Sequence, residues 1–476
     1  MDNIDDISKV TEELEIAELE LAQNSKNYQQ LSATLEKPNI NHEVREKLPS
    51  NSAIIEFKVY IPIDFSNGQR VSPGGHYAAF LLTKDKIIFK DLGLVEKSRV
   101  ILRKKRYLLE ILDKLKTLTD KESKTKYLAE IHQNLAEYYQ NLGDGAFEEY
   151  TKYIVKEYDA KLYQNLFGAF DEHLKEFDNV YIAPDLFLNL IPFSALILPD
   201  GRYWLERQTL RQLQTGRDLL RKKPTPSSDF LLAIGGVDFE THPAQAMRES
   251  SNNTRGLVEG VEFFGDLPAP SREEVQDITK YLSESEHLKN WNVKDWKGSE
   301  ASEGHLKSLT QVPRVLHFAT HAFYNERSTD NNNMIRPLTL SGIALAGANL
   351  GLEGELDSDG EDGIFYSLEA LNLNLEGTEL VVFSACDIGK GVLDISGGVY
   401  GLVRAFKIAG AYRILMTLWE VDNKFSKDFM IKFYKNWQKN QDDPAKVLRE
   451  TQLYYIKESP TQNITEHWGA YVVVGP

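Results

Sequence analysis

The stretch "ELVVFSAC" (residues 379–386) is a continuous apolar run of strand length, and "RVLHFATHAF" (314–323) is another. Such runs are typical of strands that are buried on both faces of a parallel sheet. Near their ends stand His321 and Cys386, the only cysteine among 476 residues. Because ligands bind beyond the carboxyl ends of the strands in open parallel sheets, these two side chains are the first candidates for chemistry.

Around these runs, strand patterns alternate with helical patterns from residue 228 to the end of the sequence. Further strands are predicted at 230–239, 412–419 and 468–475, and helices at 273–285, 397–410, 424–437 and 444–458. Gly410 and Pro444 stand where a helix ends and where one begins. The alternation predicts an α/β fold with a mostly parallel sheet flanked by helices.

The sequence before residue 228 has a different organisation. Strands are predicted at 53–61, 76–83, 86–93 and 179–184, with a long helical region at 95–177 and an apolar segment at 186–198. The charged, proline-containing stretch 221–229 reads as a linker, and the Glu-rich residues 1–48 as a short helical segment. We therefore predict three parts: 1–48, 49–222 and 228–476.

Composition narrows the classes of protein that fit. With 42% hydrophobic residues the chain is globular, and its net charge of −16 disfavours nucleic acid as a direct partner. One cysteine excludes an internal disulfide, which favours a reducing compartment. The N-terminus lacks a signal peptide and no stretch is apolar enough to span a bilayer, so we expect a cytoplasmic protein without a membrane partner.

A thiol and an imidazole at neighbouring strand ends would suit nucleophilic catalysis, because the imidazole can deprotonate the thiol or stabilise the thiolate. Backbone amides at Ala322 and Cys386 are candidates to bind the oxyanion. A buried, inert thiol is the alternative interpretation. His317, four residues before His321 on what alternation makes the same strand face, is expected to fill the core.

The motifs H-F-A-T-H-A (317–322) and S-A-C-D (384–387), with "GLVRAFKIAGAYRILMTLWEVDN" and "HWGAYVVVGP" after them, resemble the CHAT domain family. This family of caspase-like cysteine peptidases is related to caspases, metacaspases and separase. The resemblance extends from about residue 50 to the C-terminus. It implies that His321 is the base, that Cys386 is the nucleophile, and that residues 49–222 form a degenerate, non-catalytic caspase-like half.

Three features depart from the family pattern or extend it. Ala322 stands where the family often has glycine, and Gly397 stands where it often has glutamate. The stretch "ANLGLEGELDSDGEDG" (348–363) reads as an acidic insertion, and its pattern does not fit a calcium loop. It is interpreted as a solvated loop, with a role in activation or in gating the substrate as the alternative.

Acidic side chains near the proposed nucleophile suggest a preference for substrates with Arg or Lys before the scissile bond. The substrate-pocket candidates are Asp387, Glu420, Asp422 and, as a wall of the cleft, Trp419; surface carboxylates without such a role are the alternative. No metal and no organic cofactor are expected.

The sequence therefore predicts a cysteine endopeptidase that cleaves a specific partner protein. The family resemblance suggests regulated activation in bacterial defence or cell death, with a regulatory protein docking on the N-terminal helices or the first half. A non-catalytic scaffold or binding module of the same fold is the alternative function. Nucleotide binding is disfavoured because neither a P-loop nor a G-x-G-x-x-G motif opens a helix.

Overall fold

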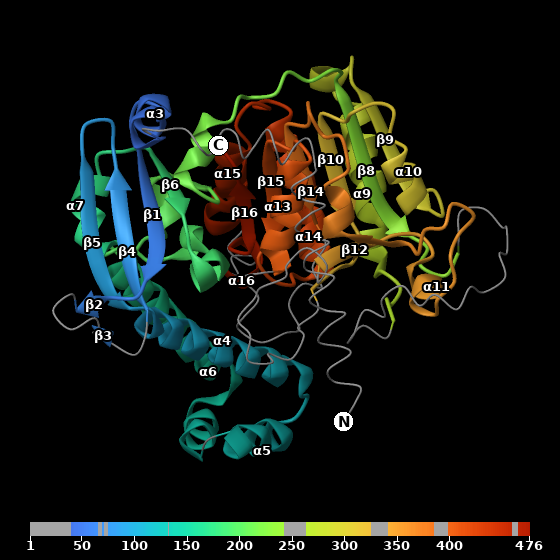
Figure 1. The fold of residues 1–476 in the computed structure, drawn as a ribbon. Coiled ribbons are helices and arrows are strands. Elements are labelled where there is room, and N and C mark those ends of the chain that lie inside the picture. The colour runs from blue at the N-terminus through green and yellow to red at the C-terminus, as the bar shows by residue number, and fades with distance from the viewer. Residues whose placement is uncertain are drawn as a thin grey trace. The chain divides into compact units, whose positions relative to one another are not determined.

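The computed structural model describes residues 40–64, 69–70, 75–131, 133–241, 263–324, 341–384, 398–458 and 465–476. Its described residues form two compact units (Figure 1). Unit 1 contains helix α3 (Ile40–Lys47) and residues 187–192 and 211–476, and unit 2 contains residues 49–186 and 193–210. Cys386 and Asp387 lie outside the described residues, as do residues 1–39 of the predicted N-terminal segment.

The sheet of unit 1 places the two decisive sequence runs next to each other. Its strands follow the order β16 (Tyr471–Val474), β15 (Arg413–Thr417), β14 (Leu380–Phe383), β10 (Val315–Ala319), β8 (Phe230–Val237) and β9 (Asn292–Gly298). The pairs among β15, β14, β10, β8 and β9 are parallel, and β16 is antiparallel to β15. Gln212, at the end of β7 (Thr209–Gln212), pairs in parallel with Val474.

Helices cover both faces of this sheet. Phe318 and His317 are consecutive in β10, so their side chains point to opposite faces. Phe318 packs against Phe406 of α13 (Gly398–Ile408), whereas His317 contacts Tyr434 of α14 (Asn423–Trp437). Two further helices pack with α14: α9 (Ala269–Ser283) and α15 (Pro444–Lys457). The predicted α/β class with a mostly parallel sheet is thus confirmed.

The predicted helix boundaries at Gly410 and Pro444 are also confirmed. Gly410 has a φ of 122° and lies so close to residue 376 that a Cβ would meet the Glu376 nitrogen at 2.5 Å. Only glycine fits such a position. Pro444 begins α15, where the missing N–H costs no helical hydrogen bond, and the Asp443 side chain caps that end.

One predicted strand, 314–323, is in fact two strands of two different sheets. The first, β10, ends at Ala319, and the second, β11 (Ala322–Tyr324), joins a three-stranded sheet with β12 (Ser341–Ala344) and β13 (Ile364–Tyr366). The Thr320 hydroxyl donates to the Ala344 carbonyl, and the Ala344 N–H donates to the His321 carbonyl. These two contacts hold the chain where it passes between the sheets.

The described residues of unit 1 also form four short helices, and an edge strand of its large sheet escaped prediction. The short helices are α10 (Glu303–Lys307), α11 (Ala348–Leu352), α12 (Ser367–Ala370) and α16 (Thr465–Trp468). The unpredicted strand is β9, "NVKDWKG", whose polar and half-exposed residues lack the apolar run that marked its neighbours. None of the described helices combines the length and the apolar character that crossing a bilayer requires.

Unit 2 has strands in the order β5 (Ile87–Leu94), β4 (His76–Leu82), β1 (Ser52–Tyr60) and β6 (Asn179–Ala183). The first three are antiparallel, and β6 is parallel to β1. A hairpin of β2 (Ile63–Asp64) and β3 (Gln69–Arg70) follows β1. Its helices are α4 (Val95–Thr117), α5 (Lys121–Ile131), α6 (Gln133–Phe167), α7 (Asp171–Leu174) and α8 (Trp204–Arg207).

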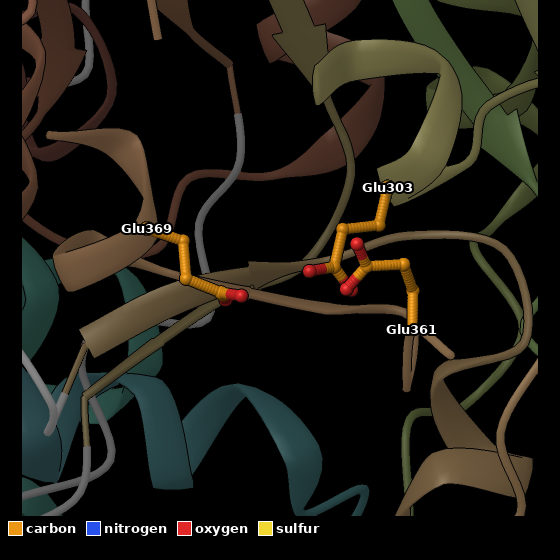
Figure 2. Close-up of side chains that lie close together, drawn as sticks. All are labelled: Glu303, Glu361 and Glu369. Carbon is orange, nitrogen blue, oxygen red and sulfur yellow. The ribbon is translucent and has the colours of Figure 1, made fainter. Parts of the chain in front are cut away.

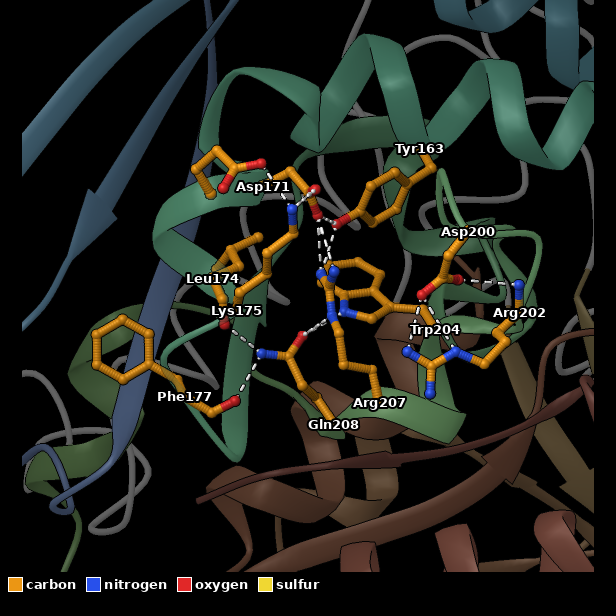
Figure 3. A network of polar contacts seen from close by, with 11 residues as sticks. Tyr163, Asp171, Leu174, Lys175, Phe177, Asp200, Arg202, Trp204, Arg207 and Gln208 are labelled. Carbon is orange, nitrogen blue, oxygen red and sulfur yellow. Dashed lines mark hydrogen bonds and ion pairs between the residues drawn. The ribbon is translucent and has the colours of Figure 1, made fainter.

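A polar network joins the helices of unit 2 (Figure 3). Arg207 donates to one carboxylate oxygen of Asp171 at 3.0 Å, and the Tyr163 hydroxyl donates to the same oxygen at 2.5 Å. Gln208 accepts from the Trp204 indole and donates to the carbonyls of Leu174, at the end of α7, and Phe177. Burial alone would raise the pKa of Asp171, but the hydrogen bonds from Tyr163 and Arg207 hold it below its usual value. The charges of this network are thus satisfied inside unit 2.

The compact units are defined by packing, and they do not coincide with the predicted parts. The chain passes from unit 2 to unit 1 at residues 210–211, whereas the proline-containing stretch 221–229 lies within unit 1 and has no helix or strand. The predicted division concerns activity, which packing does not decide. It separates residues 1–48, a non-catalytic half (49–222) and a catalytic half (228–476). That division stays a prediction.

Candidate functional site

The candidate site begins where β10 and β14 end side by side. The two strands are parallel and in register, with Phe318 opposite Phe383, and the Ser384 N–H donates to the Phe318 carbonyl at 2.8 Å. His321 follows Phe318 by three residues, and Cys386 follows Phe383 by three residues. The two runs are therefore neighbours and leave the sheet at the same edge, which is the condition under which an imidazole and a thiol that follow them could meet.

His321 is held by a backbone carbonyl and by two aromatic rings. Its Nε2 lies 2.7 Å from the carbonyl oxygen of Gly265. Because a carbonyl oxygen only accepts, Nε2 carries the hydrogen, and in the neutral ring Nδ1 then carries the lone pair. The rings of Phe239 and Phe264 lie 5.3 and 6.0 Å from the imidazole. The structure thus fixes both the tautomer and the orientation of the ring.

Neither Gly265 nor the two phenylalanines was predicted from the sequence. The motif that precedes α9 is "FFGD" (263–266), which contains no titratable group except Asp266. Every residue has a backbone carbonyl, so the sequence contains no direct signal for this contact. The weak signal that existed is an aromatic pair directly before a glycine in an otherwise polar stretch.

His317 does not share the surroundings of His321. It is fully buried, with Nδ1 3.1 Å from the Tyr434 hydroxyl and Nε2 3.2 Å from a carboxylate oxygen of Glu274 on α9. The prediction that it fills the core is confirmed. The expectation that both histidines share one strand face is wrong, because β10 ends at Ala319 before it reaches His321.

Ala322, a candidate oxyanion donor, is the first residue of β11 and is fully buried. As a strand residue Ala322 has a negative φ, so alanine fits this place without strain. Since Cys386 and Asp387 lie outside the described residues, the oxyanion roles of Ala322 and Cys386 stay predictions.

The described pocket candidates, which are Trp419, Glu420 and Asp422, lie after β15. The Asp422 side chain accepts from the Phe425 N–H at 2.9 Å and caps α14, and the indole of Trp419 donates to the Glu466 carbonyl at 2.7 Å. Trp419 is partly buried against the core, and Glu420 is exposed. These contacts assign local roles to Asp422 and Trp419, and the pocket role of all four candidates stays a prediction.

The acidic insertion 348–363 is not a simple solvated loop. Its first residues form α11 and are mostly buried, whereas Glu353 to Glu355 and Asp359 are exposed. The Asp357 side chain is buried and accepts the N–H groups of Asp359 and Glu361. The solvated-loop interpretation is therefore wrong for the beginning of the segment and for Asp357.

Three carboxylates that meet beside this insertion could be taken for a metal site. Glu303, Glu361 and Glu369 each offer an oxygen within 4.8 Å of the others (Figure 2). Lys307 Nζ, however, lies 2.5 Å from Glu303, 2.7 Å from Glu361 and 2.8 Å from Glu369. The ammonium group supplies the positive charge that a cation would bring, so we assign this cluster to structure.

Burial shapes the charges of this cluster. Burial raises the pKa of Asp362 to about 6, and it raises that of Glu303 far above its usual value, with the nearby Glu369 charge adding to the effect. Burial opposes the charge on Lys307, but its hydrogen bonds to the carboxylates raise its pKa. The cluster joins α10 and α12 to the end of the insertion.

Comparison with known proteins identifies the family. The family profile described as "CHAT domain" matches residues 156–476, more than half of the chain. This match begins within α6, later than residue 50, from which the sequence motifs suggested that the resemblance extends. Comparison with curated proteins gives no match.

Among solved structures, the chain is similar to two of the Saccharomyces cerevisiae separase–securin complex, at 3.0 and 2.6 Å resolution. Both have a TM-score of 0.44 and 9% sequence identity; they cover 91% and 97% of this chain, which spans 30% and 33% of those chains. At this level the likeness carries no argument about the site. The match of the family profile, together with the strand-end motifs, shows that the chain belongs to the CHAT domain family.

Proposed function

We propose that this chain is a cysteine endopeptidase of the caspase-like type, in which Cys386 is the nucleophile and His321 the base. The observation that supports this most strongly is the parallel, in-register pairing of β10 and β14: His321 and Cys386 each follow by three residues the paired residues Phe318 and Phe383. Membership of the CHAT domain family is the second support.

The orientation of His321 suits the role of base. Its Nε2–H is bound to the Gly265 carbonyl, so Nδ1 is the nitrogen that can accept a proton. A carbonyl partner also stabilises the imidazolium that forms after proton transfer, because hydrogen bonds from a charged donor are the stronger ones. In this proposal the carbonyl orients the base as a third member of the site.

The proposed reaction has two stages. The Cys386 proton passes to His321, and the thiolate forms a bond with the carbonyl carbon of the scissile peptide. The tetrahedral oxyanion is bound by N–H groups, for which Ala322 and Cys386 are the candidates. As the C–N bond breaks, His321 returns its proton to the leaving amine, and a thioester remains. Water, deprotonated by His321, then releases the acid and the thiol.

The substrate we propose is a specific partner protein. Asp387, Glu420 and Asp422, with Trp419 beside them, would favour Arg or Lys before the scissile bond. A regulatory protein could trigger the enzyme by docking on the N-terminal segment or on residues 49–222, in a cytoplasmic pathway of bacterial defence or cell death. The family resemblance and the single cysteine support these finer points.

Peptide cleavage tests this proposal. The purified full chain, alone and with the products of neighbouring genes, is incubated with a peptide library and with a cysteine-directed acylating probe. Because Cys386 is the only thiol, any labelled cysteine is this residue. We expect cleavage and labelling that disappear in Cys386→Ala, and cleavage that falls at least about 10³-fold in His321→Ala.

The contrary result is equally clear. If the wild-type chain, with its activator present, neither cleaves nor takes up the acylating probe, the peptidase proposal fails. The non-catalytic scaffold of the same fold would then be the better account, and capture of a stable partner by Cys386→Ala and wild type alike would identify it.

A further inference from the structure

Asn349 binds both peptide groups of one residue next to the candidate base. It lies in the first turn of α11, and only 5% of it is exposed. Its Oδ1 accepts from the Phe264 N–H at 2.8 Å, and its Nδ2 donates to the Phe264 carbonyl at 3.0 Å. This pair of contacts replaces the hydrogen bonds that a neighbouring strand would give.

The same asparagine also binds the segment that follows β8. Its backbone N–H donates to the Phe239 carbonyl at 3.0 Å, and its Nδ2 donates to a carboxylate oxygen of Glu240 at 2.6 Å. The N–H of Gly347, two residues earlier, donates to the Asp238 carbonyl. Asn349 thus joins the two segments that carry Phe239 and Phe264.

These two segments form the surroundings of His321. The rings of Phe239 and Phe264 contact the imidazole and each other. Phe264 is followed directly by Gly265, whose carbonyl binds His321 Nε2. Gly265 itself is exposed, and an added Cβ would meet no described atom within 4 Å. The position of its carbonyl therefore depends on the residue before it.

Helix formation does not require these contacts. The residue that precedes α11 is Gly347, at a φ of 80°, and the helix has no side-chain cap. The Asn349 side chain instead points to residues more than 80 positions earlier in the sequence. Its amide is satisfied by backbone that lies beside His321, which is the arrangement of a residue that positions another group.

We propose that Asn349 is a positioning residue for His321: it fixes the Phe264 peptide groups and thereby holds the Gly265 carbonyl against Nε2. This inference rests on the proposed function only for its consequence in catalysis. The structural part of the inference is that Asn349, a residue of the acidic insertion, determines which tautomer His321 adopts. In this way the insertion contributes a positioning residue to the candidate site.

The tautomer of His321 can be observed directly. Long-range ¹H–¹⁵N correlation spectra of the full chain, with ¹⁵N-labelled histidine, distinguish Nε2–H from Nδ1–H, and His321→Gln assigns the signal. We expect the neutral ring of the wild type to be purely in the Nε2–H form. In Asn349→Ala we expect a mixture of the two tautomers.

Two further variants keep the test decisive. Asn374→Ala is the matched control, because the Asn374 side chain only accepts the Glu376 N–H in an exposed turn. Asn349→Asp keeps the size and the Oδ1 acceptor, but it sets a carboxylate oxygen against the Phe264 carbonyl and Glu240. It should also give mixed tautomers, even if Asn349→Ala does not fold. A pure Nε2–H signal in a folded Asn349 variant overturns the inference.

A second measurement separates this inference from the proposed function. If both hold, the Asn349 variants should lower kcat for peptide cleavage by about 10-fold or more with a smaller change in KM, because the base is misplaced rather than the substrate unbound. If no variant or wild-type chain cleaves peptides but the tautomer changes as expected, the peptidase proposal fails and the role of Asn349 stands.

Discussion

The two units hold polar side chains in different ways. In unit 2, Asp171, Arg207 and Tyr163 bind one another, so their charges and hydroxyl are satisfied within the network (Figure 3). In unit 1, His321 is bound at Nε2 by a backbone carbonyl, which orients the ring without using a second titratable side chain. A closed network of side chains stabilises a fold, whereas a histidine fixed by backbone is prepared for proton transfer.

The largest expected effect is on the closed network of unit 2. Asp171→Ala removes the buried partner of the partly buried Arg207 and should lower the free energy of unfolding by about 3 kcal/mol. Chemical denaturation measures this loss. Asp200→Ala is the control, because Asp200 pairs with Arg202 in an exposed position and should give a far smaller change.

The contrast between the two units is contradicted if Asp171→Ala and Asp200→Ala destabilise the chain equally. It also fails if Asp171→Ala, under conditions in which the chain stays folded, changes the tautomer of His321, since the network of unit 2 would then reach the candidate site. The lowered pKa of Asp171 adds a dependence on acid: its stabilising contribution is present at neutral pH and is lost as the pH falls through that pKa.

A second prediction concerns Asp362 in the acidic insertion of unit 1, where a buried carboxylate costs stability. Burial raises its pKa from 3.8 to about 6, so the folded chain holds the proton more tightly than the unfolded chain. Stability therefore falls as the pH rises from about 4 to 6. Asp362→Asn keeps the oxygen that accepts the Ile364 N–H and should stabilise the chain at pH 7.5 by about 1 to 3 kcal/mol.

Denaturation curves at pH 4 and 7.5 measure this effect, and the exposed Asp359→Asn in the same segment is the control. The gain should shrink to about 0.6 kcal/mol at pH 4, where Asp362 is protonated in the folded state and is partly protonated in the unfolded chain. A gain of equal size at both pH values would contradict the assignment to a buried charge.

The smallest expected effect is at Asp422, where a structural and a substrate role can be separated. Asp422→Ala removes the cap of α14 and should cost about 1 kcal/mol in thermal or chemical unfolding, whereas Asp422→Asn keeps the cap. If Asp422 also binds a basic substrate side chain, Asp422→Asn should weaken cleavage after Arg or Lys at unchanged stability. Unchanged cleavage would leave Asp422 with its structural role alone.

Much of unit 1 could be predicted from the sequence because its strands are buried on both faces. Short continuous apolar runs such as "VLHFA" and "LVVF" are compatible with few structures other than a strand buried on both faces. Gly410 and Pro444 mark helix ends by their backbone chemistry. The class of fold followed from these features, whereas the adjacency of β10 and β14 comes from the structure. Strand β9 did not, because an edge strand with polar residues lacks that pattern.

The details of the site could not be predicted because backbone atoms and long-range contacts provide them. The Gly265 carbonyl is 56 residues from His321, and Asn349 is 85 residues from Phe264. An asparagine in an acidic stretch has the composition of a solvated loop, although tertiary contacts bury this one. Likewise, the end of β10 at Ala319, which separates His317 from His321, depends on contacts with β12 rather than on local sequence.

The central claim is that His321 acts on Cys386, and the ionisation of the chain's only thiol tests it most directly. The rate of alkylation by iodoacetamide, followed against pH in the wild type and in His321→Ala, reports the thiolate. We expect the wild-type rate to reach its plateau well below the ordinary cysteine pKa of about 8.5, and that of His321→Ala to rise only near it. Identical profiles would contradict the account.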